Sequence, residues 1–548
     1  MLSSLLSYSP PISLMPRSRM LKYAYACLSG MMLGFAFPPM QLGILSFFAL
    51  IPLLLVIESE CSKEHGTSLR YLYVTYFLYQ GIANWWVGSW QKESDPFLMI
   101  AGLALQFGHP FFLMIPFLAV VYIRKRIPSP IVYLALPLLY VSYEWMHSLT
   151  DASYPWLSLG YMSLSMPAIA QFADLFGVLG VSFLLVFVQS VIFVMLINDD
   201  KRFRLIGIPI LLLVLTSSIL YGNHRIHQMN VLVSESPTIN VGIVQPNINP
   251  WNKWQSEVRD QIFIHKKTMQ SIAGQAPDLW IWSETAIPFV NVSLNVMKDF
   301  SSLQSIIGHI PVLTGFAHLE LVDHPELEPL SKPFALIPGA HYVAYNAAAL
   351  VQDSSVQVHK KMRLTPFGEG FPFSQDIPLL GSILQWGVGI SGWKKGATQH
   401  NAVLMKHGKP FASIGIVICI ESIYPDFVRN YAKDGATMLS VITNDAWFDN
   451  SPGPMQHFAI SQMRAIENRR AIARCGNTGV SGIILPDGSI SLMAPPQQRA
   501  TVYGKVPQLT VSSIYSRIGD LFPMCASVLS FGIICFAGYT GRVRRERS

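Results

Sequence analysis

Long apolar runs separated by short polar connections dominate the first 222 residues and return near the C-terminus. A transmembrane helix needs about 20 consecutive, mostly apolar residues. We therefore predict seven membrane spans before residue 222 and an eighth after it. The first two are short, and Pro38-Pro39-Met40 between them indicates a tight hairpin, so their full crossing stays an open question. The predicted spans are 20–37, 40–57, 69–90, 97–123, 130–148, 174–197, 204–221 and 521–540.

Basic residues are distributed unevenly over the polar connections. Cytoplasmic loops are enriched in Lys and Arg. Here basic residues fall in every second connection, whereas the alternate connections before residue 222 contain only Lys92. A tail with several arginines follows the last span. This pattern predicts that both chain ends lie in the cytoplasm and that residues 223–518 lie on the opposite side of the membrane.

The pattern changes between about residues 236 and 505, where short β-rich apolar runs alternate with amphipathic segments, as in an α/β domain. We predict helices over 255–274 and 454–475. Strands are predicted in INVGIVQP, DLWIWSE, IPVLTGFA, YNAAALVQ, SVQVHKK, ASIGIVICIE, TMLSVITND and TGVSGIILP. The expected domains are an N-terminal membrane domain (1–222), an extracytoplasmic domain (223–518), and a C-terminal transmembrane helix with a basic tail (519–548).

Composition agrees with a membrane protein. Of the 548 residues, 51% are hydrophobic and only 13% are charged, against about a quarter in soluble domains. The net charge of +7 lies largely in the connections and the tail rather than on one soluble face, so no nucleic-acid partner is expected. The N-terminal apolar run continues into a second span, and we expect no cleaved signal peptide.

Reactive side chains follow several predicted strands. Cys419 ends the apolar run in GIVICIES, Glu284 follows DLWIW, and Lys360 and Lys361 follow the strand in VHKKMRLTPFGEG. A thiol must become a thiolate to attack a carbonyl, a carboxylate can accept its proton, and an ammonium can stabilise the resulting oxyanion. Taken singly, each has a plainer interpretation: a packed core cysteine, a helix cap, and surface charge.

Four motifs together carry a resemblance. WSETAIP, HKKMRLTPFGEG, GIVICIES and the long segment that starts at TNDAWF closely resemble the nitrilase (carbon-nitrogen hydrolase) superfamily, whose signature is a Glu-Lys-Cys triad. With multispan flanks, the chain resembles the apolipoprotein N-acyltransferase family, which completes bacterial lipoprotein maturation. The resemblance implies a multispan α-helical membrane domain joined to an α/β nitrilase-like αββα sandwich.

The resemblance also implies roles for the triad. Glu284 would be the general base and Cys419 the nucleophile. The family's lysine follows an aromatic position by two residues and precedes LxPFGE, which selects Lys361 rather than Lys360 and puts His359 in the aromatic position.

Further residues match supporting positions of the family. Glu369 matches a second carboxylate beside the triad, and Glu421 matches the acidic residue two places after the nucleophile. Trp254 aligns with a tryptophan near the acyl pocket, with Trp251 as a close alternative. The remaining expected pocket residues are Asn444, Asp445 and Trp447.

One position departs from the family pattern. Ile420 stands where the family has Tyr, between the cysteine and the acidic residue. The backbone N–H there can still serve an oxyanion, but any role of a phenol is lost. The triad is unaffected, and the consequence for substrate details stays open.

Other features have several interpretations. The run 370–393 is apolar and glycine-containing, which favours an active-site flap over a surface insertion. Its GVGISG matches a dinucleotide-binding pattern, but it lacks the preceding βαβ strand and the downstream acidic residue. His359 and His457 are lone histidines, so we expect no metal and no cofactor.

The implied reaction has two steps on one cysteine. Cys419 would take an acyl chain from a membrane phospholipid and pass it to the N-terminal amine of a diacylglyceryl-cysteine apolipoprotein. The expected partners are this phospholipid donor, the diacylated apolipoprotein and membrane lipids. The expected location is the bacterial inner (cytoplasmic) membrane, multi-pass, with the catalytic domain on the periplasmic side.

Three alternative functions are compatible with parts of this sequence. A membrane-anchored amidase could use the same triad with water as acceptor on a small C–N substrate. A transporter is disfavoured, because Glu144 and Asp174 are the main ionisable groups within the spans. A scaffold with an inactive triad is the third. Cys475 is expected to be structural, and the preferred head group, chain, acceptor lipoproteins and oligomeric state stay open.

Overall fold

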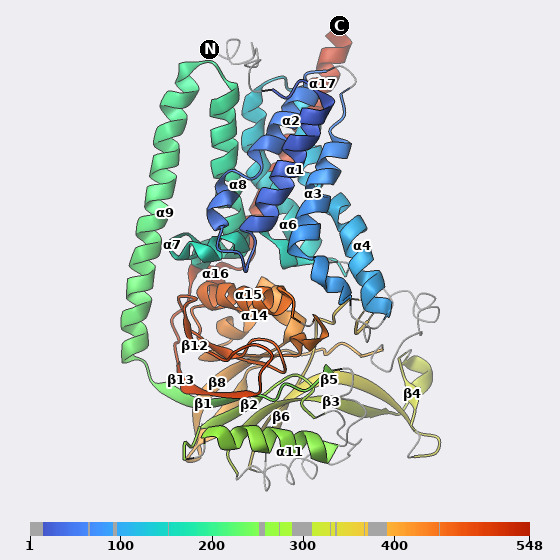
Figure 1. Ribbon diagram of the computed structural model, residues 1–548, viewed down its shortest axis with the longest axis vertical. Coiled ribbons are helices and arrows are strands. Elements are labelled where there is room, and N and C mark those ends of the chain that lie inside the picture. Colours follow the sequence, from blue (N-terminus) through green and yellow to red (C-terminus); the bar gives the residue numbers. More distant parts are fainter. Residues whose placement is uncertain are drawn as a thin grey trace. The chain divides into compact units, whose positions relative to one another are not determined.

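The chain folds into two compact units in this computed structural model (Figure 1). The first comprises Met1–Trp85, Gly102–His227 and Ile518–Ser548, and the second comprises Trp86–Ala101 and Gln228–Arg517. The structure describes residues 15–63, 66–90, 96–151, 153–250, 258–272, 274–287, 309–328, 330–334, 337–353, 355–366, 368–370, 392–448 and 450–547.

The first unit is helical. Five helical stretches in the described residues are long and apolar enough to cross a membrane: Gly43–Cys61, Leu98–Arg126, Ala173–Ile197, Lys201–Glu235 and Leu521–Arg544. The helices, with α4 extending into both units, are α1 (Arg19–Ala36), η1 (Gly43–Phe47), α2 (Ile51–Cys61), α3 (Leu69–Ala83), α4 (Pro96–Leu113), α5 (Ile115–Arg126), η3 (Pro130–Ala135), α6 (Leu136–Ser148), η4 (Pro155–Leu157), η5 (Leu159–Ser165), α7 (Pro167–Ala170), α8 (Ala173–Ile197), α9 (Lys201–Glu235) and α17 (Leu521–Arg547).

Several predicted spans differ in their bounds. The run 97–123 is divided at Met114 into α4 and α5, and Pro116 near the start of α5 suits a helix N-terminus because it needs no N–H there. The run 69–90 keeps its helix only to Ala83. In contrast, α9 extends 14 residues beyond the expected end and is about 52 Å long, well above the roughly 30 Å hydrocarbon core.

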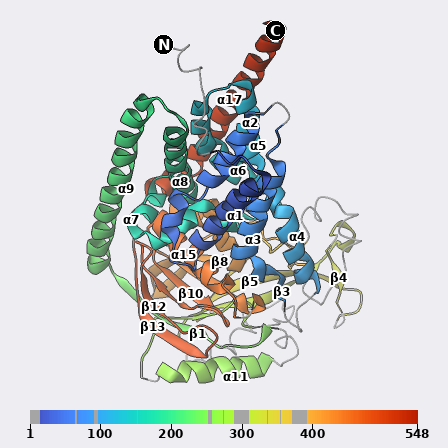
Figure 2. The ribbon, with the colours of Figure 1, turned by 45° about the horizontal axis from the view of Figure 1, so that its top comes forward.

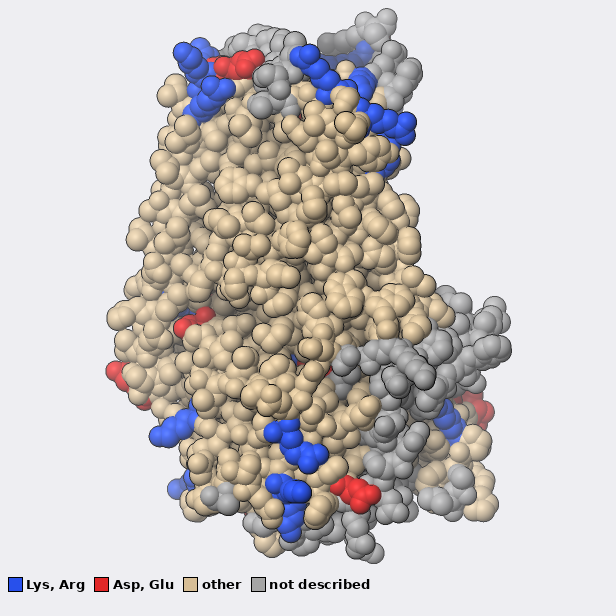
Figure 3. Space-filling model, viewed as in Figure 1, with Lys and Arg blue, Asp and Glu red and all other residues tan. Residues whose placement is uncertain are grey.

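Charged residues inside the first unit are paired. Glu58 accepts from Arg124 at 2.6 Å, with both side chains buried. Asp174 pairs with Arg225 at 2.7 Å, and Glu144 accepts the Leu159 N–H at 3.1 Å. On the face in Figure 3, Lys and Arg gather at the end of this unit where α9 begins and α17 ends, and a broad band of described surface next to them is uncharged.

The second unit contains two mixed sheets. The first has the strand order β13-β1-β2-β3-β5-β4, with β6 paired to β5, and the second has the order β12-β11-β10-β9-β8-β7. The strands are β1 (Thr238–Gln245), β2 (Leu279–Trp282), β3 (Val312–Val322), β4 (Lys332–Pro333), β5 (His341–Gln352), β6 (Ser355–Lys360), β7 (Ala402–Lys406), β8 (Lys409–Ile418), β9 (Met438–Thr443), β10 (Ile472–Gly476), β11 (Gly482–Ile484), β12 (Ile490–Met493) and β13 (Ala500–Pro507).

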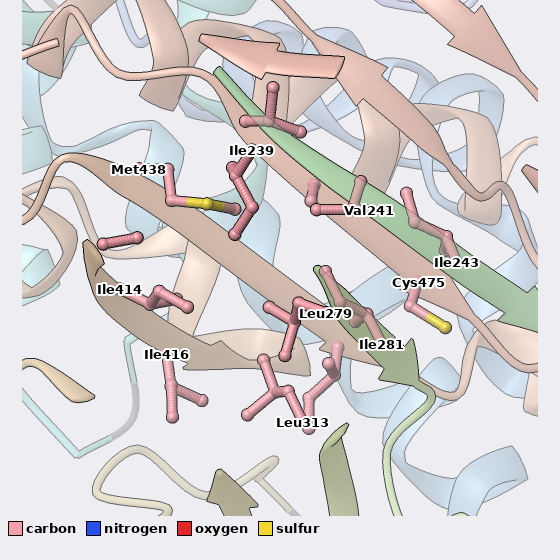
Figure 4. Packing of buried hydrophobic residues seen from close by; sticks show 14 of the residues in the cluster. Ile239, Val241, Ile243, Leu279, Ile281, Leu313, Ile414, Ile416, Met438 and Cys475 are labelled. Carbon is pink, nitrogen blue, oxygen red and sulfur yellow. The ribbon is translucent and has the colours of Figure 1, made fainter. Parts of the chain in front are cut away.

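An apolar core lies between the two sheets. It joins Ile243 and Ile281 of the first sheet to Ile416 and Met438 of the second (Figure 4). The pattern follows from the period of a strand, since alternate side chains point to opposite faces. The opposite face of the first sheet carries a second cluster that includes Trp282.

Helices cover the outer faces and complete an αββα sandwich. On the first sheet, α11 packs its apolar side against the second cluster, and α14 and α15 lie against the second sheet (Figure 2). The remaining helices of this unit are η2 (Trp85–Gly88), α11 (Val258–Met269), η6 (Gln270–Ile272), η7 (Pro325–Leu327), η8 (Cys419–Ile423), α14 (Pro425–Lys433), η9 (Asp445–Phe448), α15 (Gly453–Asn468) and α16 (Ile514–Ile518).

All eight predicted strand runs contain a strand, but the helix predicted over 454–475 was wrong at its end. The helix α15 stops at Asn468, because Arg469 has a left-handed backbone (φ 50°), and the buried strand β10 follows. The run AIARC contains no Gly or Pro, so its pattern cannot separate a buried strand from a helix turn. The sequence also missed β4, β7, β12 and β13.

Candidate active site

Cys419 lies at the point where β8 becomes the 3₁₀ helix η8. Its thiol is partly buried, and its backbone has φ 51°, in the left-handed region that a residue with a Cβ rarely adopts. The chain turns sharply here, so the side chain sits at the tip of a rigid, buried strand. Such placement suits a nucleophile, since the sheet fixes the backbone while the thiol stays within reach.

A buried cluster of charges lies in the same unit. Lys361 follows β6, and its Nζ lies 3.0 Å from Glu284 Oε1 and 2.7 Å from Glu369 Oε2. The lysine side chain is 1% exposed. One ammonium therefore sits between two carboxylates, and the alternative Lys360 pairs with Glu320 at the surface instead.

The electrostatics favour a protonated thiol next to an ammonium. Burial raises the pKa of Cys419 well above its ordinary value; the charge of Glu284 adds to this and that of Lys361 opposes it. Burial by itself would lower the pKa of Lys361, but Glu284 and Glu369 raise it well above its ordinary value. The resting site thus needs a base close to the thiol. Glu284 is close enough for its negative charge to raise the pKa of that thiol.

Asn346 organises this cluster, and the sequence did not single it out. Its Nδ2 donates to Glu284 Oε1 at 2.7 Å and to Glu369 Oε1 at 2.6 Å. Burial would raise the pKa of Glu369, but Lys361, the Thr365 N–H and Asn346 together lower it. The sequence signal that could have identified Asn346 is its single amide side chain inside the apolar run YNAAALVQ of β5.

Glu284 also reaches the second sheet. Its Oε2 accepts the backbone N–H of Asn444, just after β9, at 2.9 Å. The Asn444 side chain in turn accepts from Asn477 Nδ2 at 3.0 Å. Asn477 is thereby linked to Glu284 through Asn444, and the sequence analysis did not single out Asn477.

Glu421 connects the nucleophile turn to the lysine turn. Its Oε2 accepts the Ile418 N–H at 2.8 Å, and its Oε1 accepts the Met362 N–H at 2.6 Å. The side chain is fully buried, and His359 lies 3.3 Å away. Because Met362 follows Lys361 and Ile418 precedes Cys419, this carboxylate fixes the spacing of both reactive groups.

The remaining candidate residues are less central or lie outside the described range. The carbonyl of Trp447 accepts the hydroxyl of Ser89, and Ile420 is buried. Cys475 is buried in the core between the sheets, where its Sγ lies 3.2 Å from the Val244 carbonyl. Trp254 and residues 371–391 of the predicted flap lie outside the described residues.

Among the described residues, one cluster has the spacing to hold a metal ion. Donor atoms of Cys419, Asp445 and His457 lie within 4.8 Å of one another. However, Asp445 already accepts from Arg474 at 2.8 Å and pairs with His457 at 2.7 Å. The fixed positive charge of Arg474 opposes a cation there, so these side chains fit a hydrogen-bond network better than a metal centre.

Two family models match separate parts of the chain. Residues 29–191 match the family model for the apolipoprotein N-acyltransferase N-terminal domain, and residues 240–515 match that for carbon-nitrogen hydrolase. The predicted nitrilase-like fold and membrane-helical flank are therefore confirmed.

Relatives that match over most of their length are named apolipoprotein N-acyltransferase. The chain is 34% identical to an apolipoprotein N-acyltransferase of Chlorobaculum tepidum, covering 90% of this chain and 92% of the relative. It is 28% identical to that of Geobacter metallireducens, covering 91% and 92%. Among solved structures, a mutant amidase from Nesterenkonia sp. AN1 is 16% identical, with TM-score 0.35 over 52% of this chain and 98% of that one.

Proposed function

The chain belongs to the apolipoprotein N-acyltransferase family, and on this premise we propose that Cys419 carries a fatty acyl chain from a membrane phospholipid to the N-terminal amine of a diacylglyceryl-cysteine lipoprotein. The observation that carries the proposal is the buried contact of Lys361 with Glu284 and Glu369 in the same site as the Cys419 thiol. The chain also has apolar helices that suit substrates residing in a bilayer.

The first half-reaction forms a thioester. Glu284 accepts the thiol proton of Cys419 as the sulfur attacks the carbonyl carbon of a phospholipid ester. The negative charge that develops on the carbonyl oxygen is stabilised by the Lys361 ammonium. The C–O bond then breaks, Glu284 returns the proton to the departing glycerol oxygen, and a lysophospholipid leaves.

The second half-reaction uses an amine. The uncharged α-amine of the diacylated lipoprotein attacks the thioester carbonyl, and Glu284 accepts a proton from its nitrogen. The C–S bond breaks, the proton passes from Glu284 to the Cys419 sulfur, and an amide is released. Thiolate is a far better leaving group than an alkoxide, which is why a cysteine suits aminolysis.

Glu369 and Glu421 have positioning roles in this scheme. With two carboxylates against it, Lys361 stays an ammonium through both half-reactions, since Glu369 keeps a negative charge while Glu284 is protonated. Glu421 holds the lysine and cysteine turns together through the Met362 and Ile418 N–H groups.

The membrane arrangement is part of the proposal. We place the start of α9 and the tail of α17 in the cytoplasm and the second unit on the periplasmic side of the inner membrane. The basic residues at those two helix ends support this orientation. Donor and acceptor would both reach the site from the outer leaflet.

The test is acyl transfer between defined lipids. Purified protein in detergent is incubated with a phospholipid and a synthetic diacylated lipopeptide with a free N-terminus, and products are measured by mass spectrometry. The proposal expects one additional amide-linked acyl chain and equimolar lysophospholipid, whereas an N-acetylated lipopeptide should remain unchanged. Release of free fatty acid or hydrolysis of small amides, with no triacylated peptide, would favour a hydrolase.

A further inference from the structure

A second buried network contacts the backbone of the nucleophile. His457, on α15, has its Nδ1 2.7 Å from Asp445 Oδ1 and its Nε2 2.7 Å from Ser422 Oγ. The three side chains come from α15, η9 and η8, and all are buried. Carboxylate, imidazole and hydroxyl follow one another in hydrogen-bond contact, and we refer to these three side chains as the relay.

The carboxylate end of this relay is fixed. Asp445 Oδ2 accepts from Arg474 Nη2 at 2.8 Å, and its Oδ1 accepts from Thr443 Oγ1 at 2.8 Å. Burial would raise the pKa of Asp445, but His457 and Arg474 lower it to about 2. An ionised carboxylate only accepts, so His457 Nδ1 carries a hydrogen and donates it to Asp445.

The other end of the relay meets the nucleophile's own backbone. His457 Nε2 lies 3.1 Å from the Cys419 carbonyl oxygen, and Ser422 Oγ donates to the same oxygen at 2.8 Å. The imidazole and the hydroxyl therefore enclose the peptide group that follows the reactive thiol. These distances leave little room for that carbonyl to rotate.

This matters because the Cys419 backbone is in an uncommon conformation. A residue with φ 51° that is not glycine persists only where its surroundings hold it. Glu421 holds the backbone just before the nucleophile through the Ile418 N–H, which belongs to the peptide group between Val417 and Ile418, and the relay encloses the peptide group that follows Cys419. The two networks together hold the backbone on both sides of the nucleophile.

We propose that His457, oriented by Asp445, is a positioning residue that keeps the Cys419 turn in its left-handed conformation and so keeps the thiol aimed at the acyl carbonyl. This inference rests on the proposed function, because it assigns a role within the same reaction. It predicts an effect on the rate of thioester formation and none on the apparent affinity for the phospholipid, since His457 does not touch the donor.

Two substitutions of His457 separate the contact made by Nδ1 from the contacts made by Nε2. Asn at position 457 retains an amide near the Nδ1 position and keeps the bond to Asp445, but it cannot reach Ser422 or the Cys419 carbonyl. Gln is longer and can place its amide near the Nε2 position. His265 provides the matched control: it is fully buried on α11, with Nδ1 2.7 Å from the Gln261 carbonyl and its ring against Trp282.

The experiment measures single-turnover labelling of the full-length protein in detergent. A phospholipid with a radiolabelled acyl chain is titrated without acceptor, giving a maximal rate and an apparent donor affinity for each variant. Thermal unfolding of the same samples reports folding. We expect His457→Asn to lower the maximal rate about 100-fold, as a displacement of a reacting group by about 1 Å does. The apparent donor affinity should stay within twofold.

The matched variants decide the interpretation. His457→Gln should recover at least tenfold of the rate lost in His457→Asn, and His265→Asn should keep the wild-type maximal rate even with a similarly lowered unfolding temperature. The inference is overturned by an unchanged rate in folded His457→Asn, by a change in donor affinity alone, or by equal rate losses in His457→Asn and His265→Asn. If the wild-type protein took no label at all, the proposed function itself would fail.

Discussion

The charged half of the site, on the first sheet, and the nucleophilic half, on the second, are held by different kinds of bond. Glu284, Lys361 and Glu369 hold one another by side-chain ion pairs, with Asn346 between the carboxylates. The backbone around Cys419 is held by a bond to the Ile418 N–H on one side and by a bond to the Cys419 carbonyl oxygen on the other.

The difference follows from what each half must do. A base and an oxyanion-stabilising ammonium act through their charge, so mutual pairing sets both their positions and their protonation states. A nucleophile must leave its own side chain unencumbered, so the support has to come from its backbone. Each of the following changes removes support from one half and should leave the other half in place.

The largest effect is expected from Lys361→Met, which leaves two buried carboxylates without their counter-charge. Removal of one partner of a buried ion pair costs about 3–5 kcal/mol in the free energy of unfolding. Loss of the oxyanion donor should slow thioester formation about 100-fold or more. Both are measured on detergent-solubilised protein, by denaturation and by single-turnover labelling.

The neighbouring lysine is the control for that change. Lys360 pairs with Glu320 near the surface, so Lys360→Met should cost under about 1 kcal/mol and leave the labelling rate close to wild type. Equal losses at the two positions would show that the buried ammonium has no special role, which contradicts the account.

Asn346→Ala removes the amide that bridges the two carboxylates. The free energy of unfolding should fall by about 2 kcal/mol, because two hydrogen bonds to charged acceptors are lost. Thioester formation should slow about tenfold, which corresponds to about 1.4 kcal/mol in the barrier. Asn401→Ala is the control, because it loses bonds only to backbone carbonyls. It should reproduce the stability loss of Asn346→Ala more closely than the rate loss. If it reproduced the rate loss more closely than the stability loss, this would argue against a role for Asn346.

The nucleophilic half of the site should show a characteristic loss of stability at low pH. The pKa of Asp445 is about 2 in the folded state, below the ordinary 3.8, so its contribution to stability is complete above pH 3.8 and is lost as pH falls toward 2. This contribution is about 2 kcal/mol. Between pH 4 and pH 2, the free energy of unfolding should therefore fall more for the wild type than for Asp445→Asn, and parallel curves would contradict the pairing.

The smallest effect is expected from Cys475→Ala. This thiol packs in the core between the sheets, and its removal should cost about 1 kcal/mol. Thioester formation should proceed at the wild-type rate. A folded Cys475→Ala protein that takes no label would mean that the second thiol participates in the chemistry.

The sequence predicted those parts of the fold that depend on local pattern. Strands such as β1 and β8 are apolar runs bounded by polar residues, and their recognition needed no tertiary information. The strand β10 was missed because its residues continue the composition of α15, and only the left-handed Arg469 separates them. Tertiary burial decided the structure there.

The candidate site divides in a similar way. The candidate triad could be proposed from motifs because each member lies just beyond the end of a strand. Asn346 could not, since a single amide in an apolar strand has meaning only once β5 lies beside the loops that carry Glu284 and Glu369. The same holds for His457, which looked like a lone histidine until its partners Asp445 and Ser422 were brought to it by the fold.

The central claim is that both halves act together on one thioester at Cys419. The most direct measurement gives the purified protein a phospholipid labelled in its acyl chain, without acceptor, and then denatures it in acid. The account predicts protein-bound label that neutral hydroxylamine releases, that a diacylated lipopeptide discharges before denaturation, and that Cys419→Ala does not acquire. Absence of label on folded wild-type protein, or equal labelling of Cys419→Ala, would contradict it.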